Sequence, residues 1–141
     1  MNFFQISEYL QPFVGYADGA SHGTHNLSST TWAIFSLSGK LVRFQGICIS
    51  WLTKNITEYN GLIELFSDAI SLGIHRIIIR LDSQLGVLQL IAVYTIRNPE
   101  IHHKFLRVRL LERHFDYIQY QHISRNFNTL VDSLVNYVLN R

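Results

Sequence analysis

The chain has few of the residues from which several kinds of site are built. Of its 141 residues only Cys48 is a cysteine, which excludes an internal disulfide framework and a zinc site made of several cysteines. Its position in the apolar stretch RFQGICIS predicts a small buried side chain. No apolar run approaches the roughly 20 residues of a membrane span. A phosphate-cradling glycine loop, a dinucleotide fingerprint and a Ser–His–Asp arrangement are also missing.

Charge is sparse as well. Charged residues make up 16% of the chain and the formal net charge is +2, so a nucleic-acid partner is permitted but not indicated by charge alone. The hydrophobic fraction of 48% predicts a folded chain. The start, MNFFQISEYLQP, has no basic segment before an apolar run, so no secretory signal is expected. We expect one domain over 1–141, with its core at about 13–140, inside the cell in the cytoplasm or nucleus.

Residue periodicity predicts the order of the elements. Alternation and turn residues indicate strands at 13–21, 31–37 and 41–49, with a hairpin signal at Ser38-Gly39. The continuous apolar run at 74–82 is typical of a central strand, and 116–123 is a fifth strand. Helical spacing follows at 56–73, with Thr57 as the expected cap, then at 84–92, from Pro99 onward, and at 128–140. The order predicts a mixed α/β fold. Its five-stranded sheet combines a three-stranded antiparallel meander with parallel strands and carries helices on both faces.

Four acidic residues occupy inward positions in four different elements. Asp18 is expected to end the first strand and Asp82 ends the fourth, so the two lie side by side if these strands are parallel neighbours. Glu58 falls in the first turn of the first long helix. Asp132 shares the sheet-facing side of the last helix. Such a distribution is not that of a solvated surface.

Each acid alone has an ordinary explanation. Asp18 precedes Gly19 as turn residues do, Asp82 precedes a helix that it would cap, and Glu58 and Asp132 are common helix residues. Together they would repel one another and raise one another's pKa unless a cation joined them. Carboxylate oxygens suit Mg²⁺ or Mn²⁺, and two such ions clamp the attacking and leaving oxygens of a phosphoryl displacement.

Four segments, YADGAS, TKNITEYNGLIEL, IIIRLDSQLGVLQL and HISRNFNTLVDSL, resemble the type 1 ribonuclease H family. The resemblance spans about 15–139 and is closest to the short branch of archaea, bacteria and plant retroelements. It implies a ribonuclease H-like fold and hydrolysis of the RNA strand of RNA–DNA hybrids. It also implies two Mg²⁺ ions, with Mn²⁺ as a substitute. The acids that would hold the ions are Asp18, Glu58, Asp82 and Asp132.

The same resemblance implies contacts with the substrate. Gly19, Ala20 and Ser21 match a turn whose backbone approaches the RNA, and Asn55 and Gln84 match positions that contact the hybrid. Trp51, just ahead of Asn55, is either a core residue or one that packs on the DNA strand.

Two residues are candidates for assisting turnover. Longer family members carry a histidine in the loop before the last helix, and here Arg125 occupies a shortened loop while His122 lies three residues earlier. The resemblance leaves the choice between them open.

Other functions remain as alternatives to a hybrid-cleaving enzyme. No separate basic hybrid-binding domain is expected, so affinity for the hybrid is expected either to be modest or to come from a fused or associated reverse transcriptase. One alternative is an inactive hybrid-binding or connector module of a retroelement polyprotein. Another is an integrase-like or junction-resolving nuclease. The basic residues of the helix after Pro99, Lys104, Arg107 and Arg109, form either a solvated face or a phosphate track.

Overall fold

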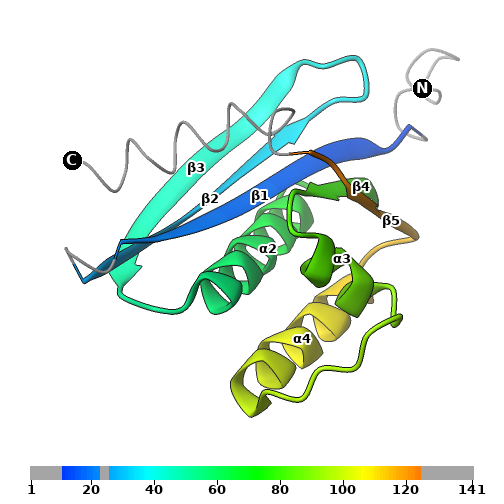
Figure 1. The fold of residues 1–141 in the computed structure, drawn as a ribbon. Helices are drawn as coiled ribbons and strands as arrows, with labels where there is room; N and C mark the ends of the chain where they lie inside the picture. The colour runs from blue at the N-terminus through cyan, green and yellow to red at the C-terminus, as the bar shows by residue number, and fades with distance from the viewer. Residues whose placement is uncertain (1–10, 23–25, 125–141) are drawn as a thin grey trace, which may run out of the picture.

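The computed structural model describes residues 11–22 and 26–124, which form one mixed sheet and three helices (Figure 1). The elements in chain order are β1 (Phe13–His22), β2 (Leu27–Phe35), β3 (Leu41–Ser50), α2 (Lys54–Ser71), β4 (Arg76–Leu81), α3 (Gln84–Leu90), α4 (Pro99–Glu112) and β5 (Tyr117–His122).

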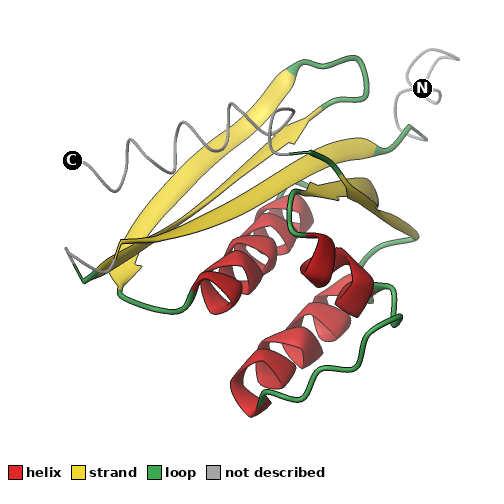
Figure 2. Cartoon of the chain, viewed as in Figure 1, coloured by secondary structure: helices red, strands yellow, loops and turns green. Residues whose placement is uncertain are grey.

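The sheet has the strand order β3-β2-β1-β4-β5. β1 and β3 each pair antiparallel with β2, whereas β4 lies between β1 and β5 and runs parallel to both. The predicted meander with added parallel strands is therefore confirmed. The three helices lie on one side of the sheet, with α2 nearest to it (Figure 2). The helix expected at 128–140, which would cover the other face, lies outside the described residues.

The core forms where α2 crosses the sheet. Leu62, Leu65 and Phe66 of α2 are buried against Ile77 and Ile79 of β4, the alternate inward residues of that strand. α4 packs on α2 through residues such as Ile101 and Val108, both buried. Burying side chains of this size contributes on the order of 2 kcal/mol each, which holds the middle of α2 against the sheet, over β1 and β2.

The start of α2 differs from the expectation. The helix begins one turn earlier, with Thr53 rather than Thr57 as its cap, and the Thr53 side chain accepts from the backbone N–H of Ile56. Thr57 is fully buried inside the helix, and its hydroxyl donates to the Thr53 carbonyl at 2.9 Å. Glu58 consequently lies in the second turn, not the first. The residue spacing fits a helix cap at either Thr53 or Thr57. Only the course of the backbone shows that Thr53 is the cap.

The edge position of β3 overturns one expectation about burial. Cys48 is exposed, although its apolar neighbours predicted a small buried side chain. Trp51, which follows the strand, is 47% exposed, so of its two expected roles the core position is wrong. β3 has a hydrogen-bonded neighbour on one side only, so its apolar sequence does not bring burial.

Hydropathy gives no sign of a membrane span in the structure. Within the described part of the chain, no helix combines the length and the apolar character that crossing a membrane would require.

Candidate active site

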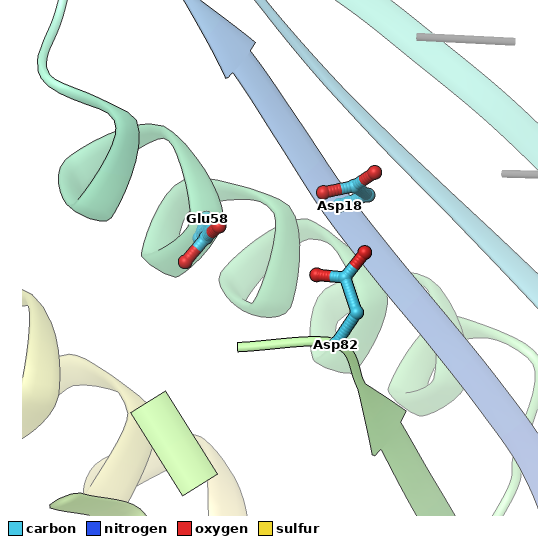
Figure 3. A group of neighbouring side chains, drawn as sticks. All are labelled: Asp18, Glu58 and Asp82. Atoms are coloured by element: carbon cyan, nitrogen blue, oxygen red, sulfur yellow. The ribbon is translucent and has the colours of Figure 1, made fainter. Parts of the chain in front are cut away.

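Three of the four predicted acids come together. Asp18 of β1, Glu58 of α2 and Asp82, which follows β4, each offer a carboxylate oxygen, and these oxygens lie within 4.8 Å of one another (Figure 3). Asp132 lies outside the described residues. The three side chains come from positions 40 and 24 residues apart in the chain, so only folding brings them to one place.

Strand register explains the proximity of Asp18 and Asp82. In the parallel pair of β1 and β4, Tyr16 is opposite Arg80, and two residues further along each chain are Asp18 and Asp82. Asp18 does not end its strand as expected, because β1 continues to His22 and Asp18 pairs with Thr31 of β2. Asp18 is only 2% exposed, and its Oδ1 accepts from the backbone N–H of Gly19 at 2.8 Å.

Close packing of α2 on β1 brings Glu58 to the two aspartates. A Cβ at Gly19 would meet the backbone nitrogen of Glu58 at 2.9 Å, and a Cβ at Gly61 would meet Thr30 Oγ1 at 2.5 Å. Real Cβ atoms do not approach other atoms so closely, so both positions need glycine for the helix to sit at this distance. The glycine in TEYNGL therefore serves helix packing beside the site.

A buried polar seam holds the start of α2 against the sheet. The Thr30 hydroxyl donates to the Thr57 carbonyl at 3.2 Å and lies 3.4 Å from the Asp18 carbonyl. Ser28 and Ser21 both donate to the carbonyl of Leu52, at 3.1 and 2.6 Å. Buried hydroxyls are costly unless bonded, so these bonds specify the position of the helix.

Sequence reasoning did not find this seam. Its signal is the run of four hydroxyl residues at 28–31, inside a strand, all of which are fully buried.

The role of Asp82 can be separated from helix capping. Ser83 is the N-cap of α3, and its Oγ accepts from the Gly86 N–H at 3.0 Å. The carboxylate of Asp82 lies instead with Asp18 and Glu58. The structure therefore agrees with a site role for Asp82.

A pocket adjoins the acidic cluster between α2 and α3. Its lining includes Glu58 and Asp82 together with Asn55, Tyr59 and Gln89. Asn55 is exposed at the start of α2, which agrees with the expected contact to a bound ligand. The floor of the pocket is apolar and includes Ala17, Leu62, Leu81 and Leu90.

The remaining predicted residues lie at the same end of the parallel strands, as far as they are described. Gln84 is the exposed first residue of α3. His122 is exposed at the end of β5 and is opposite Leu81, the residue before Asp82. Ala20 and Ser21 follow Asp18 along β1 and are half-buried. Arg125 lies outside the described residues.

The basic residues of α4 differ in their surroundings. Arg107 is exposed, whereas Arg109 donates to both carboxylate oxygens of Glu112 at 2.7 and 2.8 Å and lies over the Phe105 ring. The guanidinium of Arg109 is therefore already engaged, and a phosphate track along Lys104, Arg107 and Arg109 stays a prediction.

The donor set fits a divalent cation. Two oxygens that bind one Mg²⁺ at about 2.1 Å are at most about 4.2 Å apart, and the cluster oxygens lie within 4.8 Å of one another. A small side-chain movement would bring them to one ion or let them bridge two. Hard oxygen donors without histidine or cysteine favour Mg²⁺, Mn²⁺ or Ca²⁺ over softer metals.

Comparison with known proteins identifies the family. A family model described as "Reverse transcriptase-like" matches residues 16–138. A ribonuclease HI from Halobacterium salinarum is 34% identical over 139 residues, which are 95% of this chain and 70% of that protein. The chain belongs to the ribonuclease H family. Members of the family depend on divalent metal ions, in agreement with the acidic cluster.

Solved structures of the family have the same fold. The crystal structure of ribonuclease H1 from Halobacterium salinarum matches with a TM-score of 0.87 and 33% identity, covering 92% of this chain and 98% of that one. LC11-RNase H1, solved in complex with an RNA/DNA hybrid, matches with a TM-score of 0.84 and 25% identity, covering 91% and 96%. The prototype foamy virus protease-reverse transcriptase shares the fold at a TM-score of 0.67 and 12% identity, covering 93% of this chain and 21% of that one.

Crowded carboxylates lead to a prediction about stability. Two unit charges about 5 Å apart repel by roughly 3 kcal/mol at an effective permittivity of about 20, so Asp82→Asn should relieve strain in the metal-free protein. We expect the variant to be more stable than the parent in EDTA by about 1 kcal/mol, which corresponds to a melting temperature roughly 3 °C higher. It should also gain less from Mg²⁺, since binding to the folded state is what raises stability.

Thermal melts of both proteins, with EDTA and with Mg²⁺, measure this effect. Asp116→Asn is a matched control, because Asp116 is an exposed aspartate next to β5 and outside the cluster. An Asp82→Asn protein that melts lower in EDTA and gains as much from Mg²⁺ as the parent would contradict the electrostatic account.

Proposed function

We propose that this protein hydrolyses the RNA strand of RNA–DNA hybrids with the aid of two divalent metal ions. One observation carries the proposal, namely that the carboxylates of Asp18, Glu58 and Asp82 gather within 4.8 Å in a chain of the ribonuclease H family. A relative of the same fold binds an RNA/DNA hybrid, which supports the substrate class.

In this proposal the carboxylates of Asp18, Asp82, Glu58 and Asp132 would hold the two ions, Asp132 being assigned from the family resemblance because it lies outside the described residues. Mg²⁺ is the expected ion and Mn²⁺ its substitute, since both prefer oxygen donors. Such ions activate water and neutralise the charge that develops on the phosphate oxygens. The protein's part is to keep the carboxylates in place. The backbone bond to Oδ1 of Asp18 and the close packing of α2 on β1 support that role.

Substrate contacts are proposed on the rim of the cluster. The backbone at Gly19, Ala20 and Ser21 approaches the RNA strand, and exposed Asn55 and Gln84 bond to the hybrid. Recognition of 2′-hydroxyls across the wide minor groove would distinguish RNA from DNA. Exposed Trp51, ahead of Asn55, offers a flat apolar surface for a sugar or base edge on the same side.

Either His122 or Arg125 is proposed to assist turnover by acting on the product. His122 is supported by its place opposite Leu81 in the β4–β5 pair, whereas Arg125 lies outside the described residues and is supported by the family resemblance alone. Either side chain can attract the product phosphate away from the metal site.

The proposed setting is an RNA–DNA hybrid made by reverse transcription inside the cell. A fused or associated reverse transcriptase would deliver the hybrid, and the match to the "Reverse transcriptase-like" family model supports this partner.

The test uses labelled RNA–DNA hybrid, duplex RNA and duplex DNA with Mg²⁺, Mn²⁺ or EDTA. We expect cleavage of the RNA strand of the hybrid with either metal, no cleavage of duplex DNA, and no activity in EDTA. Hybrid binding without cleavage in any metal would instead favour a connector module. Cleavage of duplex DNA would favour an integrase-like or junction-resolving enzyme.

A further inference from the structure

A hydrogen bond between two helices lies directly behind the acidic cluster. The hydroxyl of Tyr59 on α2 donates to Oε1 of Gln89 on α3 at 2.8 Å. Tyr59 follows Glu58 in the chain, and Gln89 lies on the helix whose cap, Ser83, follows Asp82. The bond therefore joins α2, which carries Glu58, to α3, which begins two residues after Asp82.

α3 has few other attachments. It is seven residues long, and only Val87 and Leu90 are buried. Arg109 of α4 donates to the Leu90 carbonyl at its far end. A helix of this length has little stability of its own, so the part-buried bond from Tyr59 to Gln89 helps to orient it against α2.

The Tyr59 end of the bond is shielded from water, because the side chain is only 5% exposed. Glu58, Tyr59, Asp82 and Gln89 all line the same pocket.

We propose that the Tyr59–Gln89 hydrogen bond sets the separation of Glu58 and Asp82. Tyr59 and Gln89 are then positioning residues for the divalent metal site. This inference rests on the proposed function, because it assigns the pair to that site. Groups that hold metal ligands in place typically change metal affinity by 10–100-fold when removed.

Tyr59→Phe removes the hydroxyl and keeps the ring. We expect Mn²⁺ binding, measured by titration calorimetry, to weaken about 10-fold, and the Mg²⁺ concentration for half-maximal cleavage to rise by a similar factor. The rate at saturating metal should return to near that of the parent, since the carboxylates themselves remain.

Tyr120→Phe is the matched control. Its hydroxyl is also buried, and it donates to a side-chain carboxylate, that of Glu112. Glu112 is bonded to Arg109 and is not in the acidic cluster. Both variants should melt at a lower temperature than the parent, but only Tyr59→Phe should bind Mn²⁺ more weakly.

Gln89→Met removes the acceptor of the same hydrogen bond. It replaces Tyr59→Phe as the test if Tyr59→Phe does not fold. Since the two residues act through one bond, the double variant should lose no more Mn²⁺ affinity than either single variant. Losses that add would overturn the proposal. So would unchanged Mn²⁺ affinity in Tyr59→Phe or in Gln89→Met, or an equal loss in Tyr120→Phe.

The parent protein separates this inference from the proposed function. If the parent neither binds Mn²⁺ nor cleaves the hybrid, the proposed function is wrong. If the parent does both and the variants match it, only the positioning role is wrong.

Discussion

Asp82→Asn is expected to lower the rate of hybrid cleavage by more than about 100-fold, which exceeds the usual effect of a residue that only supports a metal ligand. The reason is the position of the carboxylate within 4.8 Å of those of Asp18 and Glu58. An amide keeps the volume of the side chain but removes the negative charge. A factor of 100 corresponds to about 2.7 kcal/mol of transition-state stabilisation.

Single-turnover cleavage of labelled hybrid, with the variant in excess, measures the loss. Binding of the hybrid should stay within a few-fold of the parent, because the substitution removes no proposed nucleic-acid contact. Asp116→Asn should cleave at the parent's rate. Asp82→Asn cleaving at near-parent rates would remove Asp82 from the chemistry and leave its carboxylate as a structural group.

Replacing the ribonucleotides around one scissile bond by 2′-deoxyribonucleotides should stop cleavage at that bond. Duplex DNA lacks the 2′-hydroxyls that the proposed contacts recognise, and its minor groove has a different shape. We expect at least about a 100-fold loss at the altered position. Unaltered positions elsewhere in the same hybrid should be cut as before, which provides an internal control.

Mapping the cleaved ends on a sequencing gel measures this loss position by position. Cutting that persists at the deoxy positions would mean that the 2′-hydroxyl is not read. The integrase-like or junction-resolving alternative would then gain support, because those enzymes act on DNA.

Strong periodic patterns predicted most elements well. The aliphatic run before Asp82 forms the central strand β4, Ser83 caps α3, and Asn98 and Pro99 begin α4. In each case the deciding interaction is local, between a side chain and the backbone of its own turn or strand. Such features follow from a few neighbouring residues and are readable without the fold.

Errors arose where a residue's surroundings come from distant parts of the chain. Cys48 has apolar neighbours in sequence, yet it is exposed on the edge strand β3. Thr57 has the spacing of a cap, yet it is buried in the helix against β1 and β2. Asp18 precedes a glycine as in a turn, yet that glycine lets α2 approach the strand.

The sequence by itself determined which functional groups the protein has for binding a metal ion. Acidic residues at 18, 58, 82 and 132, in segments resembling the ribonuclease H family, predict an oxygen-lined metal site. Only the tertiary structure decided how three of these acids meet. Their proximity depends on the parallel register of β1 and β4, on glycines at 19 and 61, and on the polar seam under α2. Distances between elements are set by packing across the sheet, and residue types along one element do not encode them.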